Sequence, residues 1–221
     1  MFYRQSPNYD MRPPGAVIDM VVIHYTGMRS ANEAIDRLCD PHKSVSAHYV
    51  VHEDGSILQL VEEDLRAWHA GDAFWRGNKD INARSIGIEM VNPGHEFGLE
   101  PFSDKQMAAL EILVLDILKR YPVPGRNIVG HSDVAPRRKE DPGELFDWFR
   151  LYKNGIGFWP ENVKGKKINK QQASKLLQNF GYEIDDFVKT LVAFQRHFRP
   201  TKIDGELDIE TVQLLNGLEQ Y

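Results

Sequence analysis

The sequence of 221 residues contains a single cysteine, Cys39, so no disulfide can form within the chain. It also has no long basic run, and its formal net charge is −5, which argues against a nucleic-acid-binding protein. The apolar run Ala16–Ile23 is interrupted by Asp19 and is far too short to span a bilayer. We therefore expect neither nucleic acid as a partner nor a membrane span.

The first residues, MFYRQSPNYDMRPPG, lack the apolar segment that a signal peptide requires. Taken as written, the chain is expected in the cytoplasm. A trimmed N-terminus or another export route would instead place it in the periplasm or cell envelope. The lone cysteine neither supports nor excludes secretion.

Hydrophobic residues make up 42% of the chain and aromatic residues 10%, which is typical of a packed globular core. The expected strands are 19–25, 47–52, 56–61, 85–91 and 127–129, with an Asp54-Gly55 hairpin turn between the second and third. The expected helices are 32–39, 104–121, 144–152, 171–180, 185–198 and 208–218, and Ser103 is expected to cap the second of them. Strands and helices mix without a regular βαβ repeat, which predicts an α/β fold with a central mixed sheet flanked by helices.

The composition changes at 160–168, where the sequence PENVKGKKI is polar, lysine-rich and without strand character. Three helical patterns follow it. We therefore predict a larger domain over residues 1–163 and a small three-helix domain over 164–221.

Two histidines follow apolar strands, and an aspartate lies shortly after the second. His24 ends MVVIH, and His131 comes directly after Ile128-Val129-Gly130. Asp141 follows in the same loop and precedes Pro142. Catalytic zinc usually takes three nitrogen or oxygen ligands and leaves a fourth position for water. His24, His131 and Asp141 are therefore predicted zinc ligands, although a strand-end histidine is often a core residue and Asp141 could cap the next helix.

Other residues near these motifs can carry chemistry. Glu89 stands in the otherwise apolar strand SIGIEMV and could act as a general base. Lys139 is two residues before Asp141 and could stabilise a developing oxyanion. Trp68 and His69 follow the hairpin and are expected to form a wall of a substrate cleft. For each of them the alternative is an ordinary core, paired or solvated side chain.

The motifs MVVIHYTG, SAHYVVHEDGSILQLV, AWHAG, SIGIEMVNPG and GHSDVAPRRKEDPG, in this order, resemble the zinc-dependent N-acetylmuramoyl-L-alanine amidases. That superfamily also contains the peptidoglycan recognition proteins and the phage lysozyme-type amidases. The resemblance covers about residues 17–160. It implies a mixed sheet with zinc in a surface groove, and hydrolysis of the amide that joins the lactyl group of N-acetylmuramic acid to L-alanine.

The resemblance places the zinc ligands on His24, His131 and Asp141. It points to the AmpD/AmiD-like branch, in which the catalytic glutamate and lysine correspond to Glu89 and Lys139. The phage-type enzymes instead carry cysteine at the position of Asp141.

The C-terminal segment AFQRHFRPTKIDGELDIETVQLL resembles the three-helix peptidoglycan-binding domain found behind some of these amidases. A helical cap that only packs on the larger domain is the alternative. The expected partner is peptidoglycan or a muropeptide. Envelope enzymes of the branch act on polymeric wall and cytosolic recycling enzymes on soluble anhydro-muropeptides. A non-hydrolytic peptidoglycan receptor and a zinc peptidase acting within the stem peptide are rival functions.

Overall fold

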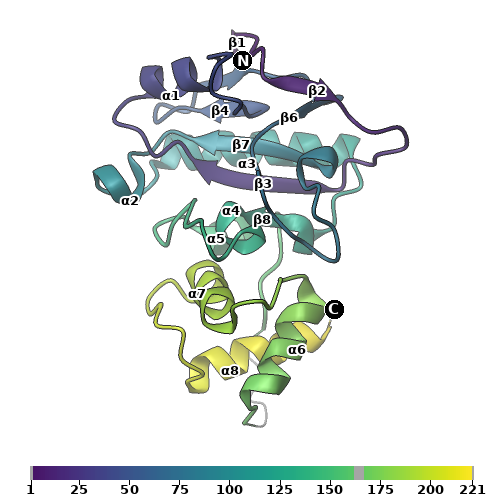
Figure 1. Ribbon diagram of the computed structural model, residues 1–221. Coiled ribbons are helices and arrows are strands. Elements are labelled where there is room, and N and C mark those ends of the chain that lie inside the picture. The colour runs from purple at the N-terminus through teal and green to yellow at the C-terminus, as the bar shows by residue number, and fades with distance from the viewer. Residues whose placement is uncertain (1, 162–166, 221) are drawn as a thin grey trace.

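The computed structural model describes residues 2–161 and 167–220 and has a six-stranded sheet at its centre (Figure 1). In spatial order its strands are β1 (Phe2–Tyr3), β5 (Ile57–Gln59), β4 (Tyr49–Val51), β7 (Ser85–Met90), β3 (Met20–Tyr25) and β8 (Ile128–Gly130). The β4–β5 pair is antiparallel and the other neighbours are parallel, so the predicted mixed sheet is confirmed. Two short strands, β2 (Tyr9–Met11) and β6 (Leu65–Ala67), form a separate antiparallel pair.

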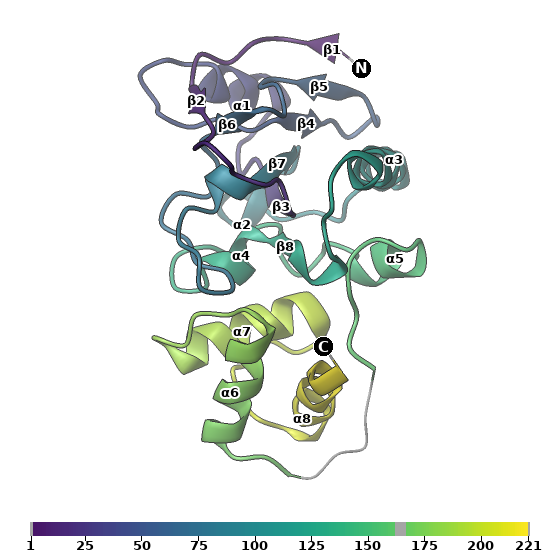
Figure 2. The same cartoon turned by 90° about the vertical axis from the view of Figure 1, so that its right-hand side faces the viewer.

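The helices flank this sheet (Figures 1 and 2). They are α1 (Ala31–Leu38), α2 (Gly94–Phe97), α3 (Asp104–Arg120), α4 (His131–Val134), α5 (Trp148–Lys153), α6 (Lys170–Phe180), α7 (Phe187–Phe198) and α8 (Ile209–Asn216), with 3-10 turns η1 (Asn82–Arg84), η2 (Gly125–Asn127) and η3 (Gly217–Gln220). The Ser103 side chain accepts a hydrogen bond from the Gln106 amide, which confirms the predicted cap of α3. Helix α5 begins later than predicted, because Asp147 rather than a residue near 144 caps it. No helix in the described ranges is long and apolar enough to cross a bilayer.

Alternation along β3 and β7 sends their side chains to two different environments. Val21 and Ile23 of β3 belong to the core that Leu110 and the other inner residues of α3 complete. Met20 and Val22 point to the opposite face and belong to a second core. His24, at the carboxyl end of β3, lies on this second face. The sheet therefore presents its polar site residues on the face away from α3.

The three C-terminal helices lie beyond the β8 edge of the sheet, next to α4 and β8 (Figures 1 and 2). Leu177 of α6 and Leu191 of α7 share one buried cluster with Val22 of the sheet. Trp75 is fully buried in the same cluster, and the ring of Tyr182 contacts it edge-on with centroids 5.0 Å apart. The predicted three helices are thus present. The predicted boundary near 163 lies outside the described residues.

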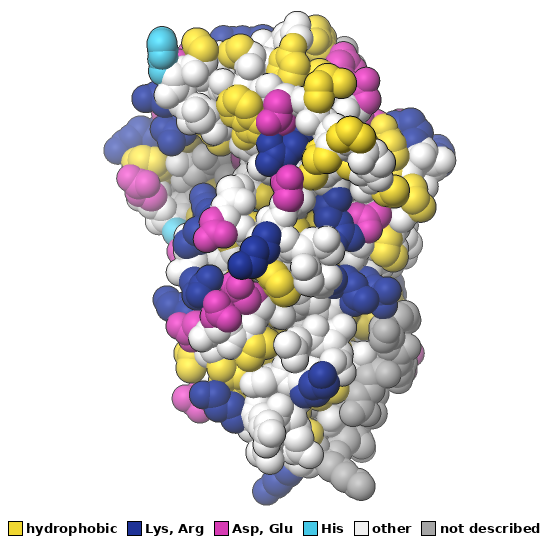
Figure 3. Space-filling view, turned by 45° about the vertical axis from the view of Figure 1, so that its right-hand side comes forward, with side chains coloured by type: hydrophobic (Ala, Val, Ile, Leu, Met, Phe, Trp, Pro, Cys, Tyr) yellow, Lys and Arg dark blue, Asp and Glu magenta, His cyan; other side chains and the backbone are white. Residues whose placement is uncertain are grey.

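The outer surface carries charges of both signs. In the space-filling view of Figure 3, Lys and Arg side chains alternate with Asp and Glu side chains on the visible face. Several of these groups form exposed ion pairs, such as Arg66 with Asp80 and Arg137 with Asp185. Exposed ion pairs contribute little to the free energy of folding, so burial of the apolar cores is the main source of stability.

Because the C-terminal helices share a core with the sheet, we expect Leu177→Ala to destabilise the whole chain. Removal of this fully buried side chain should lower the free energy of unfolding by about 2–5 kcal/mol. Urea denaturation followed by tryptophan fluorescence and by far-UV circular dichroism measures this. Ile209→Ala, at a position that is 76% exposed, is the matched control and should change stability by less than about 0.5 kcal/mol. Separate transitions in the two signals would contradict a shared core.

Candidate metal centre

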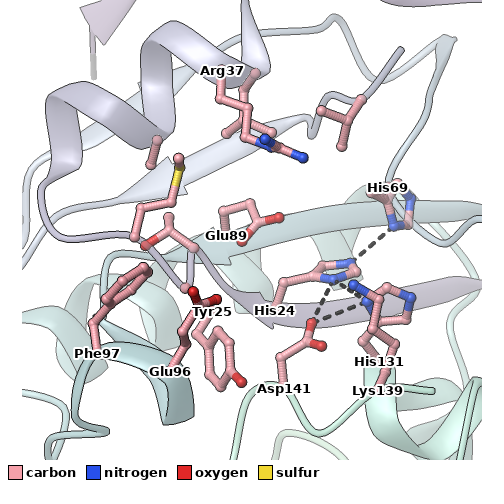
Figure 4. Close-up of a pocket in the computed structure, with 16 residues that line it drawn as sticks. His24, Tyr25, Arg37, His69, Glu89, Glu96, Phe97, His131, Lys139 and Asp141 are labelled. Carbon is pink, nitrogen blue, oxygen red and sulfur yellow. Dashed lines mark hydrogen bonds and ion pairs between the residues drawn. The ribbon is translucent and has the colours of Figure 1, made fainter. Parts of the chain in front are cut away.

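His24, His131 and Asp141, called here the metal triad, meet beyond the carboxyl ends of β3 and β8 (Figure 4). His24 Nδ1, His131 Nδ1 and Asp141 Oδ2 each lie 3.0 Å from the other two atoms. The three residues are only 2%, 3% and 5% exposed, respectively. The structure therefore brings together the three side chains that the sequence analysis singled out as ligands.

The sheet positions both histidines. Strands β3 and β8 are parallel neighbours, and Ile23 pairs with Gly130. His24, near the end of β3, and His131, directly after β8, are the next residues along the chain, so they lie side by side at this end of the sheet. The sequence analysis expected a loop at His131, whereas this residue begins the one-turn helix α4. The Asp141 carbonyl accepts a hydrogen bond of 2.9 Å from the Ser132 amide, which holds the aspartate loop against α4.

The donor atoms of the metal triad fit a tetrahedral dication with one open position. Zinc lies about 2.0–2.2 Å from nitrogen and oxygen ligands, and tetrahedral ligands at that range are about 3.3 Å apart. The observed separations of 3.0 Å are close to this value.

The protonation states of the metal triad also suit a metal. Burial lowers the pKa of His24 to about 4, and the neighbouring His131 adds to this effect. Burial alone would raise the pKa of Asp141, but the charge and hydrogen bonds of the two imidazoles hold it far below its usual range. A neutral imidazole and an ionised carboxylate are the ligand forms that bind a metal ion.

The loop His69–Ala70 contacts the outer nitrogen of each histidine in the metal triad. His131 Nε2 donates to the Ala70 carbonyl over 2.9 Å. In the neutral ring of His131 this is the only proton, so the Nδ1 lone pair faces His24 Nδ1 and Asp141 Oδ2. His24 Nε2 lies 3.0 Å from His69 Nδ1. Such contacts behind a ligand are typical of histidines that hold metals.

Glu89 lies beside His24, because the two residues are register partners in the β3–β7 pair. Its Oε2 atom is buried and has no hydrogen-bond partner in the part of the chain that the structure describes. Burial raises the pKa of Glu89 well above its usual value, the charge of Asp141 adds to this, and Lys139 opposes it. A carboxyl group with a raised pKa is suited to exchange protons near neutral pH.

A cleft of about 530 Å³ opens over the metal triad (Figure 4). Glu89, Lys139 and His69 are among the residues that line it. Trp68 is half-buried and is not among the lining residues, so its role in substrate binding stays a prediction. Arg37 of α1 and Phe97 of α2 line the opposite wall. Sequence reasoning missed these two, because nothing in their local pattern separates them from ordinary surface residues.

Asp133 links helix α4, which begins with His131, to the C-terminal helices. Its carboxylate accepts hydrogen bonds of 2.7 Å from the Gly130 amide and from the Tyr182 hydroxyl. His197 Nδ1 lies 2.7 Å from the same carboxylate, and the His197 ring stacks on Trp148 with centroids 3.9 Å apart. The C-terminal helices thus contact the segment that delivers His131. No sequence signal marks this cluster, because His197 is 64 residues away from Asp133 in the chain.

The chain is similar to a known group of enzymes. Residues 14–144 match the family model described as N-acetylmuramoyl-L-alanine amidase. The N-acetylmuramoyl-L-alanine amidase AmiD of Escherichia coli (strain K12) is 37% identical over 233 residues, covering 92% of this chain and 83% of that protein. The 1,6-anhydro-N-acetylmuramyl-L-alanine amidase AmpD of Enterobacter cloacae is 35% identical, covering 66% of this chain and 86% of that protein.

Two solved structures of such amidases are similar to this chain over almost its whole length. AmiD from E. coli, in complex with its substrate anhydro-N-acetylmuramic acid-L-Ala-D-gamma-Glu-L-Lys, superposes with a TM-score of 0.85 at 36% identity, covering 99% of this chain and 93% of that one. AmpDh3 from Pseudomonas aeruginosa, in complex with anhydromuramic pentapeptide, also gives a TM-score of 0.85, at 32% identity, and covers 99% of this chain and 95% of that one. The likeness therefore includes the C-terminal helices.

We expect Tyr182→Phe to weaken both the fold and the metal centre. It removes a hydrogen bond to a buried carboxylate, which should lower the free energy of unfolding by about 1.5–3 kcal/mol. Zinc affinity should fall too, because Asp133 also binds the amide that precedes His131. Tyr49→Phe is the matched control, since it removes a hydroxyl bond of 2.8 Å to Glu63 on the other face of the sheet. Denaturation and chelator competition measure the two effects. Equal zinc affinity in the two variants would contradict the link through Asp133.

Proposed function

Because the chain belongs to the N-acetylmuramoyl-L-alanine amidase family, we propose that it hydrolyses the amide between the lactyl group of N-acetylmuramic acid and L-alanine. The observation that carries this proposal is the metal triad beside Glu89 in one cleft, where Glu89 Oε2 has no hydrogen-bond partner among the described residues. A hydrolytic site needs that combination of a cation site and a proton acceptor. A receptor that only binds peptidoglycan has no need of this acid.

We propose that the metal triad holds zinc. The support is the donor set of two imidazole nitrogens and one carboxylate oxygen, and the ligand-ready protonation of His24 and Asp141. Bound there, zinc would polarise the scissile carbonyl and lower the pKa of a water molecule in the cleft.

Glu89 is proposed as the general base and then the general acid. Its raised pKa suits removal of a proton from the attacking water and delivery of that proton to the departing L-alanine nitrogen. The nitrogen must be protonated, since it leaves as an amine rather than as an amide anion. Lys139 is proposed to offset the negative charge on the carbonyl oxygen as water adds. Both side chains line the same cleft as the metal triad.

The substrate is proposed to be peptidoglycan or an anhydro-muropeptide. The support is the similarity to structures of AmiD and AmpDh3 that contain anhydromuramic peptides. We further propose that residues 164–221 form a unit that binds wall polymer, because the segment AFQRHFRPTKIDGELDIETVQLL resembles a three-helix peptidoglycan-binding domain. A role in packing competes with this proposal, since the helices share a core with the sheet.

The substrate proposal can be tested by incubating the zinc-loaded protein with intact sacculi and, separately, with anhydro-muropeptide. Mass spectrometry should show the sugar freed from an intact stem peptide. Cleavage of both substrates supports wall binding by the C-terminal helices, and cleavage of only the small substrate supports a packing role. Shortened peptides would identify a peptidase instead. Zinc binding without cleavage of either substrate would identify a receptor.

Two substitutions separate metal binding from proton transfer. We expect Asp141→Ala to lose zinc and activity together, because it removes one ligand of three. Glu89→Gln should keep stoichiometric zinc and lose about 10²–10⁴-fold in turnover, because the amide cannot take up the proton. Metal analysis and product release measure the two properties.

The control is Glu53→Gln, in the exposed hairpin turn between β4 and β5, which should match the wild type in both measurements. Full turnover in Glu89→Gln would refute the role of Glu89. Stoichiometric zinc in Asp141→Ala would refute the ligand assignment.

A further inference from the structure

A chain of three hydrogen bonds runs from His24 away from the metal triad. His24 Nε2 lies 3.0 Å from His69 Nδ1, and His69 Nε2 lies 3.0 Å from Ser85 Oγ. Ser85 Oγ lies 2.7 Å from the Ile81 carbonyl oxygen. His69 and Ser85 are buried, at 6% and 0% exposure. Each ring nitrogen of His69 thus has one partner.

The Ile81 carbonyl sets the direction of this chain. A carbonyl oxygen only accepts, so the hydroxyl proton of Ser85 lies between the two oxygens. The opposite orientation would leave two acceptors 2.7 Å apart with no proton between them. The Ser85 oxygen must then accept from His69 Nε2. In the neutral form of the His69 ring the single proton is therefore on Nε2, so Nδ1 accepts from His24 Nε2.

The direction of the chain determines which nitrogen of His24 is free. With the proton on Nε2, the lone pair of His24 Nδ1 faces His131 and Asp141. The reversed chain would accept at His24 Nε2 and place a proton on Nδ1, where it would block a metal ligand. The carboxylate of Asp141, 3.0 Å from His24 Nδ1, would favour that wrong tautomer.

The surroundings are shaped to hold His69 in place. A Cβ atom on Gly87 would lie 2.4–2.6 Å from three atoms of the His69 ring, so the absence of a side chain there makes room for the ring. The Asn82 side chain accepts from the His69 amide at 3.1 Å and the Ala70 amide at 2.8 Å. Asn82 therefore holds one loop that contacts both histidines of the metal triad. The ring of His69 contacts His24 Nε2, and the carbonyl of Ala70 contacts His131 Nε2.

We infer that His69 and Ser85 are positioning residues that keep His24 in the Nε2–H tautomer and thereby set the zinc affinity of the site. The inference rests on the proposed function in that it takes His24 as a zinc ligand. It gives His69 a role behind the metal, where the sequence analysis expected a contact with substrate. Ser85 acts through His69 and touches neither metal nor substrate.

The test uses the full-length, zinc-loaded protein and its Ser85→Ala variant. In the wild type, long-range ¹H–¹⁵N correlation spectra of labelled histidines should show His69 protonated at Nε2 only. Ser85→Ala removes the hydroxyl that accepts from His69 Nε2 and leaves the His69 ring packed, so the Nδ1–H form of His69 should appear. Zinc affinity, measured by chelator competition, should fall about 10–100-fold.

Ser6→Ala is the matched control. Ser6 is likewise fully buried, and its hydroxyl donates to the Leu38 carbonyl and accepts from the Asn8 amide. This variant should lose comparable stability but keep the zinc affinity and the His69 spectrum of the wild type.

The outcomes separate the inference from the function on which it rests. A wild type that binds no zinc would overturn the proposed function itself. A wild type that binds zinc but shows His69 protonated at Nδ1 would overturn only the inference. Ser85→Ala binding zinc as tightly as Ser6→Ala would overturn it as well. If Ser85→Ala does not fold, the spectrum of the wild type still shows which nitrogen of His69 carries the proton, and so still tests the inference.

Discussion

The metal triad keeps its close spacing only because the rest of the molecule holds its three side chains in place. Three electron-rich atoms, one from each residue, lie 3.0 Å apart in a buried place. Without a cation or shared protons these atoms repel one another, so the residues do not gather there through their own attraction. The parallel strands β3 and β8 place the two histidines side by side. The hydrogen bond between the Ser132 amide and the Asp141 carbonyl holds the Asp141 carboxylate next to them. Folding energy from the apolar cores holds the three atoms together.

The supports of the metal triad come from distant parts of the chain. The Asn82 side chain accepts hydrogen bonds from the amides of His69 and Ala70, the two residues that contact the histidines of the metal triad. The C-terminal helices contact Asp133, which holds the amide before His131. The C-terminal helices therefore contact, through Asp133, the segment that carries His131. A family resemblance confined to the strand-end motifs does not reveal such a contact.

The elements with strong local signals were predictable from the sequence, and so was the position of the two histidines at their ends. The apolar strands before His24 and His131 and the Ser103 cap of α3 are of this kind. Strands β1, β2 and β6 were missed, because two or three residues are too few to show alternation. The role of His69 depends on Ser85 and Gly87 from another strand, and the Asp133 cluster depends on helices far along the chain. Local patterns carry no information about such contacts.

The central claim is that His24, His131 and Asp141 form a zinc site that makes the cleft hydrolytic. The most direct test is anomalous diffraction at the zinc edge from crystals of the zinc-loaded protein. We expect one strong peak within bonding distance, about 2.0–2.2 Å, of His24 Nδ1, His131 Nδ1 and Asp141 Oδ2. No peak at this place, or a zinc ion bound to other side chains, would contradict the account.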